Sequence, residues 1–543
     1  MSFFTTHLPR EPEEKFSPEY EALSYVWGSQ EFSHCNSPSS RPEENRVIWI
    51  DALCINQSDI EERDAQVGRM GDICRLAKRV VVWLGPEENN SNIALETLDH
   101  LGEQVVVSSD LVTAACPESA ETELADLKKP LPWNEKACNN VWPDFITPSD
   151  IRDISLQALC TRSRSPIIEK FQGMINKRCC DPRDYIYGAL GMAMPAFRAR
   201  IKPHYGHTVE RVHQEAPITH IEHFKRLEVL SMCFQKDRRF DRLPSWVPDF
   251  SAQLDISGPQ EQFAAGFSRA LVQFSESEPN IIQVAGDNYY AALEALRAIA
   301  PENLGLDTTT PYPTGEPFKT AYAITLCQDS LEDRFEGGKY PRLKTWIKQD
   351  SPNALFGPRA KENKDKSVIP TGYEDTIVTR CQGRPYVVTE EGYIGWGATG
   401  TQPGDIICVF LGSKDPIILR PQPESDSFTL VGNRDFYGLG DANVLLGPLP
   451  FNWSVVVDDD TSGYCFFQFW NKKTKLTKDD PRLGALPEGW ESVKEHRERT
   501  GDDPFVYRWF RNVETGEEIN WDPRMSIDAL KKRGVNIEMF SLE

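Results

Sequence analysis

The clearest alternation of hydrophobic and polar positions lies between residues 47 and 85. Residues 47–50 are a β-branched and aromatic run too brief for a helix, so they predict a buried strand. From Ile60 onward apolar residues recur three, four or seven positions apart, which predicts an amphipathic helix. Its apolar face comprises Ile60, Val67, Met70, Cys74, Ala77 and Val81. Residues 79–84 predict a second buried strand, and this order favours a right-handed parallel βαβ unit.

The start of the predicted helix carries its own signals. Ser58 and Glu61 have the spacing of a capping box, which satisfies backbone N–H groups of the first turn. Asp59, Glu61 and Glu62 also place negative charge at the positive end of the helix dipole. We therefore expect the helix to begin just after Ser58.

The loop between the first strand and this helix is where the pattern predicts chemistry. Ligands of open parallel sheets bind outside the carboxyl ends of the strands. The polar residues placed there are Asp51, Asn56, Gln57 and Glu62. They are candidates to line a cleft; alternatively they cap backbone groups, as such side chains usually do in loops.

Four motifs resemble those of the fungal heterokaryon-incompatibility (HET) domain. They are YEALSYVWG at 20–28, WIDALCINQ at 49–57, the ER–QV–M pattern at 62–70 and VVWLG at 81–85. The resemblance implies a fungal intracellular protein of non-self recognition, linked to programmed cell death, with an α/β domain distantly related to the TIR domain. The family-motif positions that it marks as a site are Tyr25, Trp27, Gly28, Asp51, Cys54, Asn56, Gln57, Arg63, Gln66, Met70 and Trp83.

Two function classes follow from this HET-like core. TIR relatives that consume NAD use a glutamate near the carboxyl edge of the sheet, and Glu62 or its neighbour Glu61 is the candidate by position. NAD would be a substrate, the carboxylate would stabilise positive charge on the ribose, and no resident cofactor is implied. The alternative, which we favour, is a signalling module that self-associates or binds a protein partner, because the helix dipole favours glutamates there anyway.

The chain departs from the family pattern in two places. Residues 29–46 are rich in Ser, Pro and Asn where the family has another strand and a helix, so either the sheet is thinned or the gene model is imperfect. Cys74 stands where the family commonly has tyrosine. The first departure motivates a third hypothesis, an inactive paralogue with a shortened domain.

Downstream patterns predict helices and then a small β unit. The sequence CDPRDYIYGALGM resembles the DPRD motif that follows HET domains, and Arg183 paired with an acid is its structural interpretation. Trp246, between prolines, is expected to anchor the preceding helices. From residue 379 the period falls to two, which predicts antiparallel strands. They lie at 384–389, 392–396, 405–411, 416–419 and 428–431.

The C-terminal part contains an internal repeat. LPFNW at 449–453 recurs as LPEGW at 486–490, and each copy continues through aromatic strands to an Asp-Pro-Arg exit. The repeat resembles a tandem pair of WW domains, three-stranded sheets that bind proline-rich segments. The first copy has Lys478 or Asp479 where the binding tryptophan would fall, and Trp521 of the second is one position late. We therefore favour a structural role.

Composition narrows the function classes further. Acidic residues number 82 and basic residues 60, a net charge of −22, so we expect no binding to nucleic acid or anionic lipid. The 13 cysteines show no CxxC pairs, which fits reduced cytoplasmic thiols and no metal site. No apolar run approaches twenty residues, so neither a membrane span nor a signal peptide is expected.

Together the patterns predict a multidomain chain, α/β at first and then helical and antiparallel β. The expected parts are a flexible N-terminus (1–19), a HET-like α/β domain (20–165), a helical DPRD and LPSW segment (166–255), a mixed or loop-rich region of unassigned role (256–375), a small antiparallel β unit (376–446), and the degenerate WW-like repeats with a tail (447–543).

Overall fold

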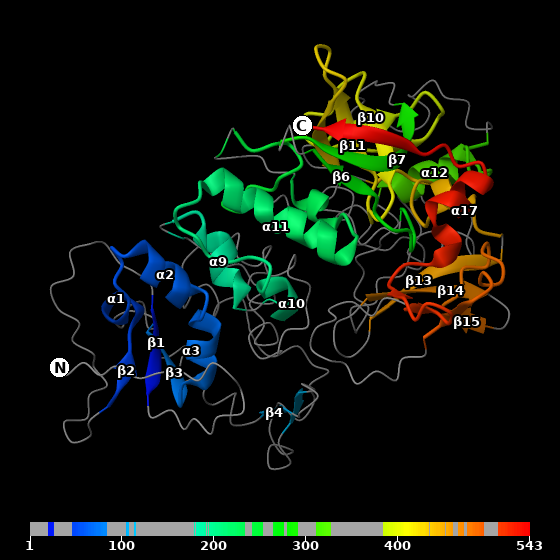
Figure 1. The fold of residues 1–543 in the computed structure, drawn as a ribbon. Coiled ribbons are helices and arrows are strands. Elements are labelled where there is room, and N and C mark those ends of the chain that lie inside the picture. Colours follow the sequence, from blue (N-terminus) through cyan, green and yellow to red (C-terminus); the bar gives the residue numbers. More distant parts are fainter. Residues whose placement is uncertain are drawn as a thin grey trace, which may run out of the picture. The chain divides into compact units, whose positions relative to one another are not determined.

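The structure is a computed structural model in which two compact units form (Figure 1). The first unit contains residues 1–165, 187–194 and 202–206, and the second contains the rest of the chain. The described residues are 20–25, 46–83, 105–107, 113–115, 179, 181–191, 193, 195–233, 240, 242–252, 264–275, 280–290, 311–326, 384–433, 435–450, 452–459, 465–471, 475–493 and 509–543. The predicted flexible N-terminus, the stretch 29–45, Trp27 and Gly28 lie outside them.

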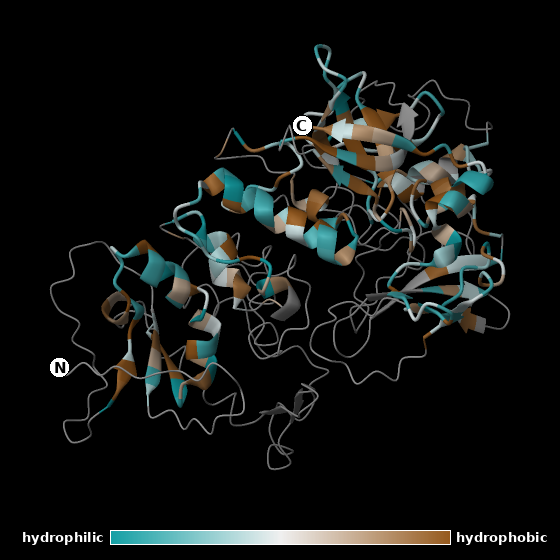
Figure 2. Ribbon diagram, in the orientation of Figure 1, coloured by the Kyte–Doolittle hydropathy of each residue, from teal (hydrophilic) through white to brown (hydrophobic). Residues whose placement is uncertain are grey.

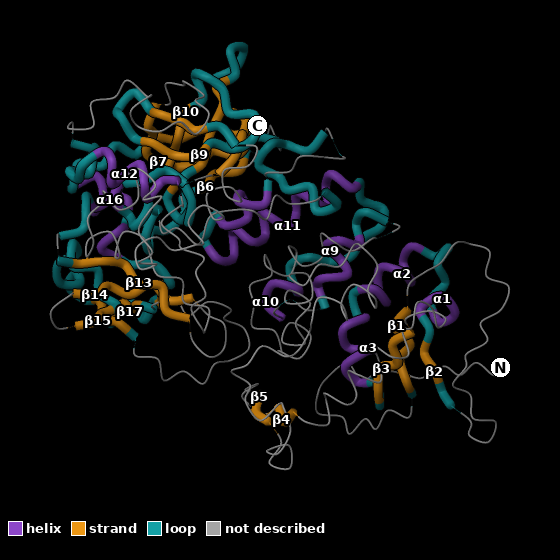
Figure 3. Tube along the Cα trace, turned by 180° about the vertical axis from the view of Figure 1, so that it is seen from behind, coloured by secondary structure: helices purple, strands orange, loops and turns teal. Residues whose placement is uncertain are grey.

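The first unit is built on a three-stranded parallel sheet, seen from behind in Figure 3. Its strands are β1 (Glu21–Tyr25), β2 (Ile48–Trp49) and β3 (Arg79–Trp83). The strands predicted at 47–50 and 79–84 both form and run parallel. They are not neighbours, because β1 pairs with each of them and lies between them. A separate hairpin joins β4 (Val105–Val107) to β5 (Thr113–Ala115).

Three short helices connect β2 to β3, so the prediction of one continuous helix is wrong. They are α1 (Asp51–Cys54), α2 (Ile60–Val67) and α3 (Met70–Leu76). The break between α2 and α3 falls at Gly68 and Arg69. Glycine inside a helix lowers helix stability by about 1 kcal/mol relative to alanine, because its backbone loses more conformational entropy. Ending the helix at Gly68 therefore sacrifices little helix stability.

The core of the first unit lies between the sheet and α3. Tyr20, Ala22 and Ile73 are buried there, and the Tyr20 hydroxyl donates to the Ile73 carbonyl oxygen at 2.6 Å. The apolar face predicted for the long helix is shallower than expected, because Ile60 is 48% exposed and α2 buries none of its residues. The prediction that both strands are buried is also wrong: neither residue of β2 is buried, and four of the five residues of β3 are exposed. No described element covers that strand as α3 covers β1.

The second unit begins with helices around buried aromatic residues. α9 (Asp184–Leu190) passes from the second unit into the first at Tyr187, and α10 (Pro195–Arg198), α11 (Val209–Phe224) and a 3-10 helix η3 (Glu228–Met232) follow. Trp246 is fully buried, as its position between prolines suggested, and its indole N–H donates to the Asn280 carbonyl oxygen at 2.8 Å.

A closed five-stranded barrel forms the centre of the second unit. Its strands are β7 (Ile282–Tyr290), β10 (Ile406–Phe410), β11 (Ile417–Pro421), β12 (Phe428–Asn433) and β19 (Glu538–Leu542). They pair in the ring β10-β11-β12-β19-β7-β10, with β6 (Val272–Phe274) added to β7. β10 is apolar throughout and β11 mostly so (Figure 2), and β10 is buried along its whole length. A packed barrel has no unpaired edge within its ring.

The five strands predicted after residue 379 all form, but only three of them enter the barrel. The other two are β8 (Tyr386–Val388) and β9 (Ile394–Trp396), which make a hairpin that packs on α12 (Phe318–Leu326) through a buried aromatic cluster. The barrel takes its remaining strands, β7 and β19, from segments on which sequence patterns placed no strand.

The internal repeat is a structural repeat of two three-stranded antiparallel sheets. The first consists of β13 (Trp453–Asp459), β14 (Cys465–Asn471) and β15 (Lys475–Thr477). The second consists of β16 (Trp490–Ser492), β17 (Phe510–Asn512) and β18 (Glu518–Ile519). α16 (Asn443–Leu446) precedes the pair, and η5 (Pro523–Met525) and α17 (Ile527–Lys532) follow it.

Each repeat is closed by the same arginine contact. Arg482 bonds both carboxylate oxygens of Asp480, at 2.9 and 2.7 Å, and donates to the Gly447 carbonyl oxygen at 2.7 Å. Arg524 does the same with Asp522, at 2.9 and 2.6 Å, and with the Gly484 carbonyl oxygen at 2.7 Å. Each glycine lies two residues before the Leu-Pro of its copy. The Asp-Pro-Arg exit therefore ties the end of each repeat to its beginning.

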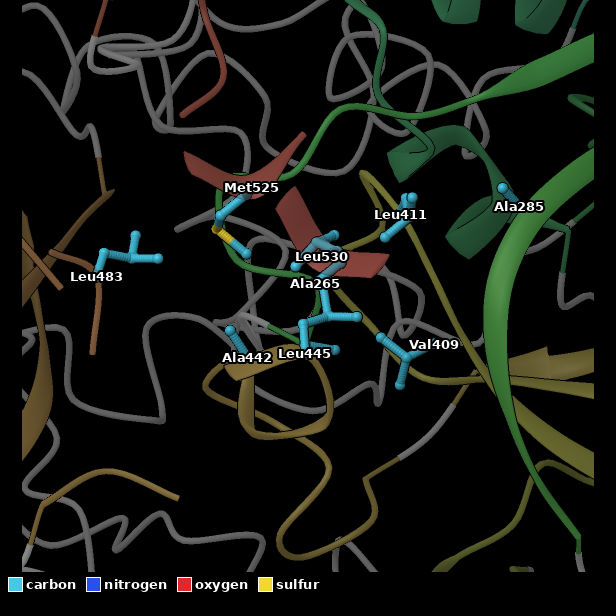
Figure 4. Close-up of a cluster of buried hydrophobic side chains, with 10 residues drawn as sticks. Ala265, Ala285, Val409, Leu411, Ala442, Leu445, Leu483, Met525 and Leu530 are labelled. Atoms are coloured by element: carbon cyan, nitrogen blue, oxygen red, sulfur yellow. The ribbon is translucent and has the colours of Figure 1, made fainter. Parts of the chain in front are cut away.

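Residues 264–270, inside the predicted region of unassigned role, contact several other parts of the second unit, and we call them the hub. The Phe267 carbonyl oxygen accepts from Asp522 N at 3.0 Å, and Phe267 packs on the core of the first three-stranded sheet. Arg226 bridges the carbonyl oxygens of Ser268 and Asn520, at 2.9 and 3.1 Å. Beside this segment lies a buried apolar cluster in which Ala265, Leu445, Met525 and Leu530 meet (Figure 4).

Candidate functional site

The polar residues predicted to line a cleft follow directly after β2. Asp51 begins α1, and its carbonyl oxygen accepts from the side-chain amide of Gln57 at 3.3 Å. The Asn56 side chain accepts from Ser58 N at 3.2 Å. Both contacts join a side chain to a nearby backbone group, which is the geometry of local capping.

The two candidate catalytic glutamates lie in the first turn of α2. The N-cap residue is Asp59, whose carboxylate accepts from the backbone N–H groups of Glu61 and Glu62 at 3.0 and 3.2 Å. The predicted capping box at Ser58 is therefore wrong, because Asp59 takes these N–H groups instead. Glu62 is partly buried and its Oε1 accepts from Asn56 N at 3.2 Å, whereas Glu61 is exposed. Glu62 thus closes the loop between α1 and α2.

Two charged residues in the middle of α2 hold a distant segment of the first unit. Asp64 accepts from Tyr205 N at 2.7 Å, and its second oxygen lies 2.8 Å from Nδ1 of His204. The guanidinium of Arg63 stands 3.6 Å from the centroid of the Tyr205 ring, a cation–π contact. The Tyr187 hydroxyl accepts from His204 N at 3.1 Å. We call these five residues the α2 clasp.

Sequence reasoning found one member of the α2 clasp and missed the others. Arg63 is a family-motif position, but Asp64, His204, Tyr205 and Tyr187 carried no assignment to a site. Asp64 and His204 are 140 residues apart along the chain, so no local period could pair them. The clasp uses a family-motif arginine to hold the chain where it returns to the first unit.

The other family-motif positions are spread over the first unit. Tyr25 and Trp83 are the last residues of β1 and β3 and are partners in the register. Gln66 and Met70 flank the break between α2 and α3. Cys54 is exposed at the end of α1. The family-motif residues that the structure describes therefore do not form one site. They lie in three places: the loop after β2, the break between α2 and α3, and the ends of β1 and β3.

The amino edge of the same sheet carries a buried charge cluster. Glu21 is 8% exposed and accepts from Nε of Arg46 at 2.9 Å and from Nε of Arg79 at 2.7 Å. The hydrogen bond from Arg46, supported by Arg79, lowers the pKa of Glu21, although burial acts in the opposite direction. Arg46 precedes β2 and Arg79 begins β3, so the three charges join all three strands at one end.

The outer edge of β3 is a second candidate site. β3 ends the order β2-β1-β3 and pairs with β1 over all five of its residues. Among the described residues, no strand pairs with its other edge. Val82 is 61% exposed, Val80 43% and Trp83 37%. An exposed apolar edge strand is a template for pairing with another chain.

Two other kinds of site are absent from the described ranges. No group of three or more His, Cys, Asp or Glu side chains there is arranged to hold a metal ion. No helix in those ranges is both long enough and apolar enough to cross a membrane.

Comparisons with known proteins match this chain in two regions and along most of its length. The family described as "Heterokaryon incompatibility protein (HET)" matches residues 37–142, and the "Het-6 beta-barrel domain" matches residues 359–446. "Heterokaryon incompatibility protein 6, OR allele" of Neurospora crassa is 33% identical over 612 residues, covering 79% of this chain and 90% of the relative. No solved structure matches. The barrel match spans β10, β11 and β12, whereas β7 and β19 lie outside it.

Proposed function

This chain belongs to the family of fungal heterokaryon incompatibility proteins, and from that premise we propose that it is a cytoplasmic signalling module of non-self recognition. In this proposal, contact between its first unit and another protein chain triggers programmed cell death. The HET-like unit supplies the contact, and the second unit supplies a stable body. No reaction of its own is required.

The contacts of the family-motif residues support a non-catalytic role. Asp59, Asn56 and Gln57 bond neighbouring backbone groups, and the Glu62 carboxylate accepts the backbone N–H of Asn56. A catalytic carboxylate is normally held by groups that aim it at a reacting atom. The contact made by Glu62 instead shapes the loop to which it belongs.

The observation that carries the proposal is the apolar outer edge of β3, with which no described strand pairs. Three of its five residues are large apolar side chains that expose more than a third of their surface. Isolated exposed apolar residues are ordinary, but a row of them on an edge strand is costly unless another chain covers it. This supports a protein partner for the first unit.

The experiment is induced expression of the full chain in a fungal host, with viability and intracellular NAD followed together. We expect viability to fall while NAD is unchanged. Glu62→Gln keeps an oxygen that can accept from Asn56 N, so we expect it to kill as the wild type does, with Glu61→Gln as the exposed control. An early fall in NAD that Glu62→Gln abolishes would overturn the proposal.

A second candidate function is hydrolysis of NAD in a TIR-like site. The observation in its favour is the position of Glu62, partly buried at the start of α2, beyond the end of β2. A carboxylate there could stabilise positive charge on a ribose as nicotinamide leaves. The same expression experiment separates the two functions, and the absence of both death and NAD loss would favour an inactive paralogue.

We also propose that the C-terminal repeats are WW-like sheets retained for structure. Phe267 packs on the core of the first sheet, and the Arg269 guanidinium lies 4.6 Å from the centroid of the Trp521 ring beside the second. Contacts with the chain's own hub therefore occupy the core of the first sheet and the residue before the exit of the second. We expect the full chain not to bind proline-rich peptides in a binding assay. Saturable binding of such a peptide would contradict the structural role of the repeats.

A further inference from the structure

The outer edge of β3 has a sequence suited to one particular partner. We propose that β3 pairs with β3 of a second copy of this chain, antiparallel and centred on Val81, so that two three-stranded sheets join into one sheet of six strands. This inference rests on the proposed function and names the partner that the first unit contacts.

The strand matches itself in that orientation. Val80 lies opposite Val82 of the second copy, and Val81 lies opposite its own equivalent. Cross-strand pairs of β-branched residues are among those that stabilise antiparallel sheets. Arg79 lies opposite Trp83, and although its Nε donates to Glu21, its side chain is 61% exposed, so its guanidinium can also contact the face of that ring. The pairing is reciprocal, with Arg79 of each copy opposite Trp83 of the other, which a two-fold contact requires.

Charge also favours a second copy at this edge. The chain carries a net charge of −22, so two copies repel each other over most of their surface. Residues 79–83 contain no acidic side chain, and their one basic side chain, Arg79, is already paired with Glu21. This edge is therefore a place where two acidic chains approach without facing like charges.

The size of the contact sets its expected strength. Five residues a side bury less than the roughly 1,200 Å² at which stable protein interfaces begin. We therefore expect a weak, reversible dimer whose population depends on concentration. Such a contact suits a signal that begins when the local concentration of the chain rises.

The test is sedimentation velocity of the full chain over a wide range of concentration. The wild type is expected to pass from monomer to dimer. Val82→Lys places a charge on the exposed edge and should weaken the dimer about tenfold or more, since charged side chains are the usual means of blocking edge pairing. The matched control is Val513→Lys, because Val513 is 58% exposed in the turn after β17. It should leave the dimer unchanged.

A double variant tests the register itself. Val80→Glu combined with Val82→Lys places opposite charges across the two-fold axis, so it should restore the dimer that Val82→Lys loses. Thermal unfolding of every variant checks that each one folds, and all should melt within a few degrees of the wild type because Val80, Val82 and Val513 are all exposed.

Three results would overturn the inference. They are a wild type that stays monomeric, equal weakening by Val82→Lys and Val513→Lys, and no rescue by the double variant. A monomeric chain that still kills cells would refute the pairing and leave the proposed function standing. A dimer with the predicted register that has no effect on viability would support the pairing and refute the proposed function.

Discussion

The two units of this chain differ in whether the outer strands of their main sheets are paired. In the second unit β7, β10, β11, β12 and β19 close into a ring, and Val409 of β10 has no exposed surface. In the first unit β3 is an outermost described strand of the sheet, and its Val82 is 61% exposed. Both strands are rich in β-branched residues, so the difference comes from what covers them and not from their composition.

This difference suggests that the two units have different roles. Closing the barrel requires β19 to pair with β7 from more than 200 positions earlier in the sequence, and such non-local pairing slows folding but leaves no strand of the ring with an unpaired edge. The open sheet forms from residues 21–83 alone among the described strands, and no described strand pairs with the outer edge of β3. We interpret the barrel as the stable body and the open sheet as the surface for contact.

The largest expected effect is on the closing strand of the barrel. Phe540 of β19 is 3% exposed and packs against the rings of Phe410 and Phe428, at centroid distances of 5.7 and 5.5 Å. Phe540→Ala should lower the free energy of unfolding by about 4 kcal/mol, measured by chemical denaturation. Met539→Ala, on the exposed side of the strand, should cost less than about 0.5 kcal/mol. Equal costs would mean that β19 does not close the barrel.

A slightly smaller effect is expected when the arginine that ties the end of a C-terminal repeat to its beginning is replaced. The side chains of Arg482 and Asp480 are 5% and 3% exposed, so Arg482→Met leaves a buried carboxylate without its partner. The expected loss of unfolding free energy is about 3 kcal/mol. Arg511, 43% exposed and paired with Glu518, provides the control, and Arg511→Met should cost less than about 1 kcal/mol. A negligible loss of unfolding free energy in Arg482→Met would show that the contact between Arg482 and Asp480 does not stabilise the repeat.

The same substitution in both units compares their strands directly. Val409→Thr buries a hydroxyl in the barrel and should cost about 2 kcal/mol, whereas Val82→Thr leaves the hydroxyl in water and should change stability by less than about 0.5 kcal/mol. Chemical denaturation measures both. A large cost at Val82 would mean that β3 is covered and that the contrast between the units is false.

The smallest expected effect concerns pH and the charges at the amino edge of the open sheet. Because the pKa of Glu21 is lowered in the folded chain, the unfolded chain takes up the proton first as the pH falls. The stabilisation is therefore complete above the ordinary pKa of 4.5 and is lost as the pH falls below it, through the folded value. The melting temperature of the wild type should exceed that of Glu21→Gln at neutral pH, and the gap should narrow in acid. A gap independent of pH would exclude this ion cluster as the cause.

Local patterns in the sequence predicted the strands but not their neighbours. The runs that became β2, β3 and β8 to β12 have β-branched or alternating residues that are visible without any partner. The insertion of β1 between β2 and β3, and the closure of the barrel by β7 and β19, depend on pairing between distant segments. Gly68, where the helix breaks, is a residue that disfavours helices. The spacing of apolar residues nevertheless continues across it, and for that reason the prediction was one continuous helix.

The candidate site was predictable to a similar extent. The motif positions in the loop after β2 were identified, and their contacts are the local caps that polar loop residues usually make. The α2 clasp and the hub at residues 264–270 were missed because their partners lie far away in the sequence. The exposed edge of β3 was missed for another reason: an apolar run predicts burial, and the sequence does not show what is left uncovered.

The central claim is that the open edge of the first unit, and not a reaction, carries the signal. Its most direct test is viability together with NAD after induced expression of the wild type, Val82→Lys and Val513→Lys at equal protein levels. The account predicts that the wild type and Val513→Lys kill with NAD preserved, and that Val82→Lys does not kill. Killing by Val82→Lys equal to the wild type, or a fall in NAD before viability is lost, would contradict it.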